Sequence, residues 1–446
     1  MFKVVYHEVA SQNGSHRLPV ILVDVKNSQS VTTMFLANTG ARYEKENEEG
    51  LAHFFEHMVF KGTKKFPSPK ILAETLDSVG ADFNAFTSKE YTGYYVRSAT
   101  SNFTLALDVL SDMLFQAKLR QSDIDREKGV IIEELNMYQD DPPAHIADVF
   151  EEMVFTKRSL AHSVIGRKET IQSFQSADFE NFLRQFYAPE NLLLVIAGGI
   201  QALCRDESEI LSQVETMLDK LQDERIQVKN AAPKLAGANP TLIAQKSFSK
   251  QKFKLINKAT AQAHFVMAWP AINASHRDRY ALQVLSTIVG GNMSSRLFNK
   301  VREEHGLAYY VHSDLEFYHD TGFFGCSAGV DASRAEEAIK LSKAVFTDLL
   351  DKKAKISAQE LARVKDYLRG KTLLSLESSN QLAQFFGLRK LLREETVTVE
   401  EVLKKFDVVT IEDLDRIAQA IIREDELRLA IIGDFKNEEK LRLAMS

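Results

Sequence analysis

The sequence has few cysteines and no long apolar run, and each shortage excludes a class of protein. Only two cysteines, Cys204 and Cys326, occur among the 446 residues. They lie far apart and form no Cys-x-x-Cys pair, which excludes a disulfide-held scaffold and a zinc site built from thiolates. The longest uncharged apolar run is residues 192–200, whereas a membrane-spanning helix needs about 20 residues. We therefore expect no membrane span.

The sequence also lacks an excess of positive charge. Lys and Arg total 56 against 62 Asp and Glu, so the formal net charge is −6. A chain with this balance has no basic surface for wrapping nucleic acid, and we expect no nucleic-acid partner. The N-terminus alternates like a strand and lacks the apolar core and cleavage site of a signal peptide, so we expect a cytoplasmic location.

The composition and the length together indicate a globular protein with more than one domain. Hydrophobic residues make up 44% and charged residues 26%, which argues against extended disorder. A polar stretch between about Asp219 and Ser247 carries two prolines and has no sustained periodicity, as expected of a linker. We predict domains at residues 1–220 and 246–446, joined by a linker at 221–245.

The two predicted domains repeat one pattern of elements. Each begins with an apolar strand followed by a helix, and each ends with an amphipathic helix followed by a short apolar strand that stops at a glycine. The matching elements are the strands at 31–37 and 261–268, the helices at 177–186 and 411–422, and the strands at 191–198 and 426–433. No glycine-rich strand-to-helix turn occurs. The pattern therefore predicts an α+β fold of two homologous halves, each a mixed, largely antiparallel sheet with helices packed on one face.

The strongest chemical signal is a His-x-x-Glu-His motif within the apolar segment 50–63. His53 and His57 are four residues apart, so on a helix both imidazoles project from one face, and Glu56 lies beside them. Two neutral imidazoles and a carboxylate near an open position are what a hydrolytic zinc site needs. A histidine pair can also be an ordinary surface feature, but burying these groups without a partner is costly. The motif, which is that of the inverzincins, favours zinc.

A catalytic zinc usually has a third protein ligand. Residues 125–138 predict a helix on which Glu127 and Glu134 share one face. The same face carries apolar residues: Val130, Ile131 and Tyr138. We predict that Glu134 binds the metal and that Glu127 supports the site or handles a proton. Glu133, one position around the helix, is the alternative ligand, although a solvated helix charge explains it more simply.

The run HFFEHMVFKGT begins at His53, and Glu134 follows 77 residues after His57. This combination resembles the insulinase/pitrilysin-type zinc metallopeptidases. Within these it is most similar to the mitochondrial-processing-peptidase branch and its bacterial relatives. The resemblance covers essentially the whole chain. It implies two homologous halves arranged as a clamshell, one Zn²⁺ per chain, and endopeptidase activity with Glu56 as general base.

The resemblance also implies that only the first half binds zinc. Aligned by eye, the second half has three other residues at the positions of the motif: Leu282, Leu285 and Ser286. None of these side chains is a zinc ligand, so the second half is expected to serve another role.

Residues 80–90, GADFNAFTSKE, resemble the active-site edge strand of the family. The resemblance implies that Asn84 and Ala85 bind substrate, because an unpaired strand edge holds an extended peptide through its backbone. By itself this segment indicates no more than a hairpin. Phe54, inside the zinc motif, is expected to line a pocket beside the scissile bond.

Residues 295–309 resemble the family segment that carries a paired arginine and tyrosine, here Arg302 and Tyr309. The resemblance implies that both donate hydrogen bonds to the carbonyl oxygen as it gains negative charge. From the residues alone, Arg302 is a surface helix charge.

The resemblance further implies a closed chamber of four domains around a peptide substrate, either an extended peptide or a presequence. A chain with two domains would then act as a homodimer, or as a heterodimer with a related chain that lacks the motif. One alternative is a catalytically silent family member that serves as an assembly or core subunit, although such chains usually lose motif residues. The other is an unrelated metal-binding or interaction protein.

Overall fold

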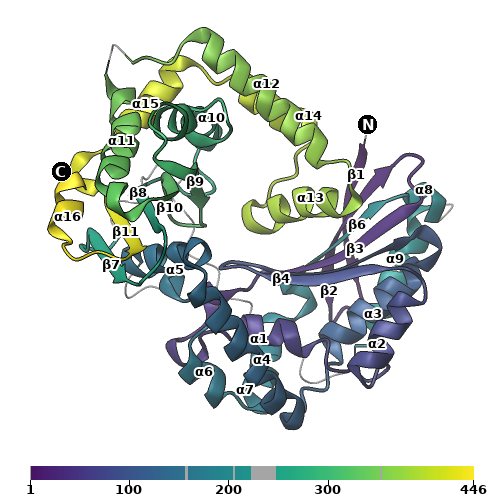
Figure 1. Cartoon of the computed structure of the whole chain (residues 1–446). Helices are drawn as coiled ribbons and strands as arrows, with labels where there is room; N and C mark the ends of the chain where they lie inside the picture. The colour runs from purple at the N-terminus through teal and green to yellow at the C-terminus, as the bar shows by residue number, and fades with distance from the viewer. Residues whose placement is uncertain (1, 156–158, 204–205, 222–247, 352–353, 446) are drawn as a thin grey trace. The chain divides into compact units, whose positions relative to one another are not determined.

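The computed structural model describes residues 2–155, 159–203, 206–221, 248–351 and 354–445. The chain divides into two compact units, each made of three chain segments (Figure 1). Unit 1 comprises Met1–Asn136, His162–Lys234 and Leu373–Thr398; unit 2 comprises Met137–Ala161, Leu235–Thr372 and Val399–Ser446. The predicted linker at 221–245 lies outside the described residues, except for Leu221.

Unit 1 is built on a six-stranded mixed sheet with the strand order β1-β2-β6-β3-β5-β4. Its strands are β1 (Phe2–Ala10), β2 (Arg17–Val25), β3 (Ser30–Ala37), β4 (Asp82–Thr87), β5 (Thr92–Ala99) and β6 (Leu192–Gly198). Only β2 and β6 pair in parallel, and the remaining neighbours are antiparallel. Strand β4 therefore forms one edge of the sheet and pairs with β5 alone.

Helices from distant parts of the chain cover the unit 1 sheet. They are α1 (Leu51–Met58), α2 (Pro69–Asp77), α3 (Phe103–Phe115), most of α4 (Gln121–Asp140), α6 (Lys168–Ser173), α7 (Ser176–Phe186), α8 (Ile200–Leu203), α9 (Glu207–Asp219) and α13 (Ser379–Arg393). Phe35 and Leu194 point into the core beneath α1 and α3, whereas Leu36 and Val195 meet Gly387 of α13 on the opposite face (Figure 1). A Cβ on Gly387 would lie 2.5 Å from Leu36, so the glycine permits this close approach.

Unit 2 is built on a five-stranded sheet with the order β7-β11-β8-β10-β9. Its strands are β7 (Phe253–Asn257), β8 (Ala263–Pro270), β9 (Ala308–Phe317), β10 (Gly322–Val330) and β11 (Arg428–Gly433). Its helices are α5 (Pro142–Val154), α10 (Arg279–Gly290), α11 (Ala335–Thr347), most of α12 (Ala358–Ser375), α14 (Val399–Asp407), α15 (Ile411–Ile421) and α16 (Glu439–Met445). Strand β9 forms one edge, and α10 packs against it.

Each unit includes one helix from the other side of the linker, so the two units interleave along the sequence. The predicted domains at 1–220 and 246–446 do not include this interleaving. Helix α5 precedes the linker but packs on β8 and β11 of unit 2, where the Phe150 and Phe323 rings lie 5.3 Å apart. Helix α13 follows the linker but packs on β2, β3 and β6 of unit 1. Each sheet thus gains a helix on its second face, because its apolar residues on that face also need cover. The predicted α+β class with mixed sheets is confirmed.

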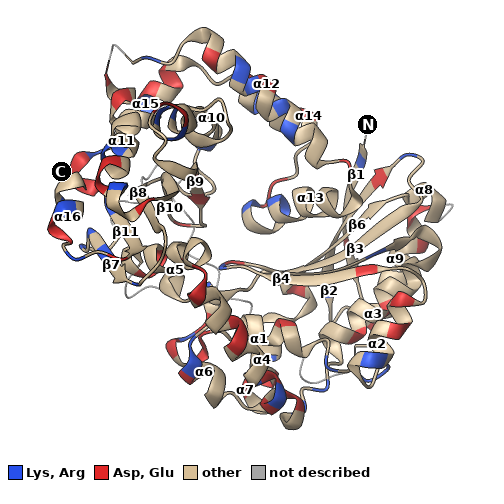
Figure 2. Ribbon diagram, viewed as in Figure 1, with Lys and Arg blue, Asp and Glu red and all other residues tan. Residues whose placement is uncertain are grey.

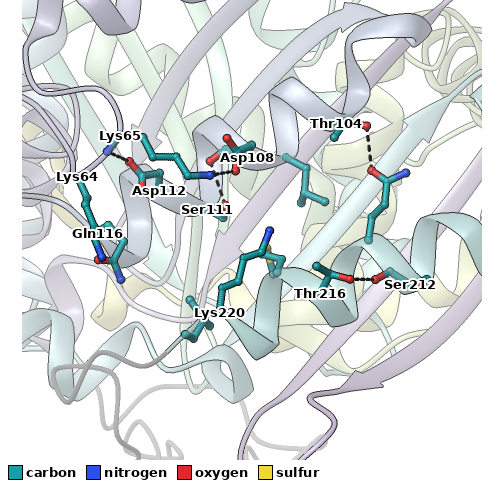
Figure 3. A pocket seen from close by; sticks show the side chains of 14 residues that line it. Lys64, Lys65, Thr104, Asp108, Ser111, Asp112, Gln116, Ser212, Thr216 and Lys220 are labelled. Carbon is teal, nitrogen blue, oxygen red and sulfur yellow. Dashed lines mark hydrogen bonds and ion pairs between the residues drawn. The ribbon is translucent and has the colours of Figure 1, made fainter.

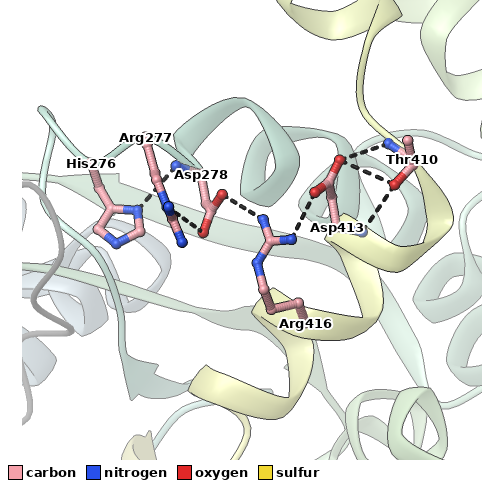
Figure 4. Close-up of polar contacts among 6 residues, drawn as sticks. All are labelled: His276, Arg277, Asp278, Thr410, Asp413 and Arg416. Carbon is pink, nitrogen blue, oxygen red and sulfur yellow. Dashed lines mark hydrogen bonds and ion pairs between the residues drawn. The ribbon is translucent and has the colours of Figure 1, made fainter.

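A polar network within unit 2 joins the start of α10 to the start of α15 (Figure 4). Arg416 donates to Asp278 at 2.6 Å and to Asp413 at 2.8 Å. Thr410 caps α15 by accepting a hydrogen bond from the Asp413 amide, which satisfies one free donor of the first helical turn. The network ties the start of α10 to α15.

Charged residues are scattered over the helices of both units, whereas the central strands β3, β6 and β8 carry none (Figure 2). Among the described residues, no helix is both long enough and apolar enough to cross a membrane.

Candidate metal centre

Helix α1 begins at a backbone position that requires glycine. Gly50 has φ 94°, and a Cβ there would lie 2.4 Å from the Ile165 carbonyl oxygen. The buried Glu44 carboxylate accepts hydrogen bonds from the Gly50 and Ala52 amides at 2.8 and 2.7 Å. Burial raises the pKa of Glu44 well above its usual range. These contacts fix the start of the helix and hence the direction of its polar face.

The polar face of α1 meets one carboxylate of α4. His53 Nε2 lies 3.7 Å from Glu134 Oε1, and His57 Nε2 lies 3.5 Å from Glu134 Oε2. One ligand atom of each of these three side chains lies within 4.8 Å of the others. Among the described residues, this is the group of His, Cys, Asp and Glu side chains found to converge in this way. The structure therefore brings together the three predicted ligands.

The chemistry of this donor set fits zinc. Burial lowers the pKa of His53 to about 3, and the neighbouring His57 contributes a smaller part of this shift. His53 is therefore neutral near pH 7, which is the form of imidazole that binds a metal. Its Nδ1 atom is buried and has no hydrogen-bond partner among the described residues. Its Nε2 atom is the one that faces Glu134. Two imidazole nitrogens and one carboxylate are a common ligand set of hydrolytic zinc sites.

Glu127 contacts the His57 ring at Nδ1, the nitrogen that does not face Glu134. The His57 Nδ1 atom lies 2.9 Å from Glu127 Oε1, and Lys61 Nζ lies 2.7 Å from Glu127 Oε2. Burial alone would raise the pKa of Glu127, but hydrogen bonds from His57 and Lys61 outweigh it and the pKa is lowered. An ionised carboxylate here accepts a hydrogen bond from the Nδ1–H group and leaves Nε2 free for a metal. Two roles were considered for Glu127, support of the site and handling of a proton. These contacts favour support of the site.

The buried face of helix α4 is rotated from the one predicted, although both include Glu127 and Ile131. Val130 is 52% exposed and Tyr138 is 42% exposed, so neither belongs to the apolar stripe. The buried stripe consists of Ile124, Glu127, Ile131 and Leu135. Glu133 is exposed, as expected of a solvated helix charge, and is not part of the convergent group.

Glu56 lies on the same helical face and is held by a side chain of β4. Thr87 Oγ1 donates to Glu56 Oε2 at 2.6 Å. Burial raises the pKa of Glu56, against the opposing effects of the Thr87 hydrogen bond and of His57, while the nearby Glu134 adds to the rise. A carboxylate with a raised pKa beside a metal site is suited to accept a proton from water and to release it again.

The predicted substrate residues lie at the sheet edge next to α1. Asn84 is exposed and Ala85 is half-buried on β4, and the Asn84 side chain accepts a hydrogen bond from the Ala85 amide at 2.8 Å. Phe54 does not lie at this edge. Its side chain is fully buried and packs against Phe174 and Phe179, with ring centroids 6.0 and 5.0 Å apart. It has no surface for a peptide to contact, so the prediction that it lines a substrate pocket is corrected.

Arg302 and Tyr309 lie in unit 2, on a π-helical turn at Phe298–Glu304 and on β9. Both are exposed, and the Arg302 guanidinium lies 4.9 Å from the centroid of the Phe298 ring. Their predicted role in catalysis stays a prediction.

Lys61 and Thr87 contact the site but were not predicted from the sequence. Lys61 follows His57 by four residues, a spacing at which helical side chains meet, and Thr87 follows Ala85 by two, on the same strand face. Both signals are present in the sequence, but a lysine and a threonine at these spacings are too common to stand out.

A cavity of about 440 Å³ lies elsewhere in unit 1, between α3 and α9 (Figure 3). None of the metal-site residues lines it. Lys65 contacts Asp108 and Thr104 donates to Gln213, so much of its polar lining is satisfied internally. The chemistry of the converging imidazoles, rather than the size of this cavity, identifies the candidate site.

The chain is similar to known proteins in family, sequence and structure. Residues 19–168 match the family described as Insulinase (Peptidase family M16), and residues 173–368 match the Peptidase M16 inactive domain. An uncharacterized zinc protease of Streptomyces coelicolor is 32% identical, with 96% of this chain and 90% of the relative covered. An uncharacterized zinc protease of Bacillus subtilis is 31% identical, with 96% and 98% covered.

Two solved structures share the fold. A protease from Helicobacter pylori has a TM-score of 0.83 at 20% identity and covers 96% of this chain and 99% of its own. A peptidase M16 inactive domain from Pseudomonas fluorescens has a TM-score of 0.82 at 18% identity and covers 97% and 98%.

Proposed function

Because the chain belongs to the M16 insulinase family of peptidases, we propose that it is a zinc-dependent endopeptidase that cleaves extended peptides. The observation that carries the proposal is the convergence of His53, His57 and Glu134, with Glu56 on the same helical face. A cluster of one buried imidazole, one half-buried imidazole and a half-buried carboxylate is costly without a cation to satisfy it.

We assign one Zn²⁺ per chain to His53, His57 and Glu134. Zinc, when bound, is a Lewis acid that polarises a peptide carbonyl and makes water more acidic. Glu56 takes a proton from the attacking water as its oxygen bonds to the carbonyl carbon. The C–N bond then breaks, and Glu56 returns this proton to the leaving amine.

The edge of β4 is the proposed peptide-binding surface. It pairs with β5 on one side only, so its other side offers backbone donors and acceptors to an extended chain. Binding through the backbone gives affinity with little sequence preference. Asn84 and Ala85 lie in the middle of this strand, and its last residue contacts Glu56. The edge therefore leads a bound peptide towards the proposed general base.

The remaining parts of the proposal come from the family. Arg302 and Tyr309 are proposed to donate hydrogen bonds to the oxyanion, and their guanidinium and phenol groups are suited to this role. The chain is proposed to work within a closed chamber, as a homodimer or with a related chain that lacks the motif. Presequence-like peptides are the proposed substrate class within the processing-peptidase-like branch.

The experiment is hydrolysis of internally quenched peptides by the purified chain, together with metal analysis of the same sample. We expect about one zinc per chain, as the three-ligand set requires, and activity that a chelator removes and added zinc restores. Glu56→Gln should keep the metal and lose turnover, whereas the exposed neighbour Glu133→Gln should keep both.

Two outcomes would contradict the assignment. Zinc lost from Glu133→Gln but kept by Glu134→Gln would overturn the choice of ligand. A zinc-loaded chain that cleaves no peptide in a broad library, alone or with a related chain, would favour the silent-subunit alternative.

A further inference from the structure

We propose that Thr87 is a positioning residue for Glu56 and that it couples the peptide-binding edge strand to the general base. The inference rests on the proposed function. Thr87 is the last residue of β4, and its hydroxyl donates to Glu56 Oε2 at 2.6 Å. A hydrogen bond this short to a carboxylate belongs to the strong, charge-assisted class.

Thr87 is the one side chain in the described part of the chain that hydrogen-bonds Glu56. The contact engages Oε2, and no other described residue hydrogen-bonds Oε1, so Oε1 is the atom available to take a proton. A glutamate side chain has several rotatable bonds, whereas the β-branched threonine has a stiff χ1. The stiff residue therefore fixes the orientation of the flexible one.

The sheet fixes the threonine in turn. Thr87 pairs with Thr92 at the end of the β4–β5 register. Side chains on a strand alternate between faces, so Thr87 shares its face with Phe83 and Ala85, which pack against the core of α1 and α3. The Phe83 ring lies 6.1 Å from that of Phe60, just beyond α1. The hydroxyl is thus held at α1 by packing along its own strand.

The opposite face of β4 is anchored separately. The Phe86 ring lies over Gly93 of β5, where a Cβ would lie 2.2 Å from the ring. With one face packed on the core, Phe86 anchoring the end of the other face and the outer edge unpaired, β4 is the element that an added peptide strand would contact and the element that holds Glu56. A peptide that pairs with β4 therefore restrains the same backbone that positions the base.

The kinetic test compares Thr87→Val with Thr87→Ser in the zinc-loaded enzyme. Valine keeps the shape and strand preference of threonine but cannot donate. We expect kcat to fall about 10- to 100-fold, the range for a misplaced catalytic group, with KM and zinc content unchanged. Serine should restore most of kcat. The matched control is Thr92→Val, whose hydroxyl donates to the Thr39 carbonyl instead, and which should leave kcat unchanged.

Two further measurements separate positioning from a general structural role. In the Glu56→Gln background, Thr87→Val should cause no additional loss, because its effect passes through Glu56. In metal-free protein, the infrared carboxylate band that Glu56→Gln removes should shift in Thr87→Val and stay in place in Thr92→Val. An additive kinetic loss or an unshifted band would overturn the proposal. The infrared test needs no activity, so its failure is distinct from failure of the proposed peptidase function.

Discussion

The two units place a helix against the edge strand of a sheet in the same way, but among the described residues only unit 1 carries the candidate metal site. Helix α1 contacts β4 in unit 1, and α10 contacts β9 in unit 2. At the aligned positions of α10, Leu282 and Leu285 are fully buried, and Ser286 hydrogen-bonds Ser313 of β9 at 2.9 Å. The same local scaffold is therefore an apolar core in one unit and holds the candidate metal site in the other.

The difference lies in what surrounds the helix as much as in the helix itself. In unit 1 the polar groups of α1 find partners on α4 and β4, namely Glu134, Glu127 and Thr87. In unit 2 the corresponding positions are satisfied by apolar packing and one neutral hydrogen bond. A buried polar site is stable only when all of its members have partners. The comparison can be tested from both sides.

The largest expected effect comes from giving unit 1 the residues of unit 2. The combined substitutions His53→Leu, Glu56→Leu and His57→Ser should abolish zinc binding and peptide hydrolysis while the chain stays folded. Removing the base alone typically costs about 10²- to 10⁴-fold in rate, and losing the ligands removes the metal as well. Metal analysis, peptide hydrolysis and circular dichroism are the measurements. Zinc retained by this variant would show that the ligands lie elsewhere.

The reverse exchange should destabilise unit 2 without creating a metal site. Leu285→Glu places a carboxylate in the fully buried position that corresponds to Glu56. We expect a loss of about 3–5 kcal/mol in the free energy of unfolding, measured by urea titration, because the buried charge has no partner. Leu285→Met, which conserves volume, is the control and should cost less than about 1.5 kcal/mol. Equal stability of the two variants would mean that unit 2 already contains a partner for the charge.

Removing the support that Glu127 gives His57 should have a smaller effect, which we expect in the zinc affinity. Glu127→Gln keeps a hydrogen-bond acceptor but removes the charge next to His57 and Lys61. We expect zinc affinity to fall about 10- to 100-fold, as for other residues that orient a metal-bound histidine. Competition with a chromogenic chelator measures this change. Wild-type affinity in Glu127→Gln would show that packing alone orients the ring.

The smallest expected effect, taken per pH unit, is a pH dependence of the stability of the metal-free protein. The pKa of His53 is lowered to about 3 in the folded chain by burial, against an ordinary value of about 6.5. The unfolded state therefore binds more protons between these values, so the stability of the fold should decrease as pH falls through this window. The slope is at most about 1.4 kcal/mol per pH unit. Urea midpoints at several pH values should show it in wild type and a shallower dependence in His53→Leu, which has leucine as unit 2 does.

Much of the fold could be predicted from the sequence because strand and helix periods are local properties. The strands now seen as β3, β6, β8 and β11, and the helices α7 and α15, were all expected near their observed bounds. The family resemblance carried by the His-x-x-Glu-His motif is confirmed. The interleaving of the units was not expected, because no local pattern records which sheet α5 or α13 will cover.

Two errors at the site have the same cause. The sequence places Phe54 inside the motif, but a shift of one residue rotates a side chain by about 100° around a helix, and Phe54 turns into the aromatic core. Val130 sits one residue from Ile131 and turns outward for the same reason. Which of two apolar residues faces the interior depends on the neighbouring element, and that element is distant in sequence.

By itself the sequence determined the spacing of His53, Glu56 and His57 on one helical face, because that spacing depends only on the geometry of a single helix. The sequence favoured Glu134 over Glu133, but only the tertiary structure decided that Glu134 meets those imidazoles, that Glu127 contacts both His57 and Lys61, and that Thr87 hydrogen-bonds Glu56. These contacts join elements separated by many residues. Their formation depends on how apolar faces pack against one another, which no single segment specifies.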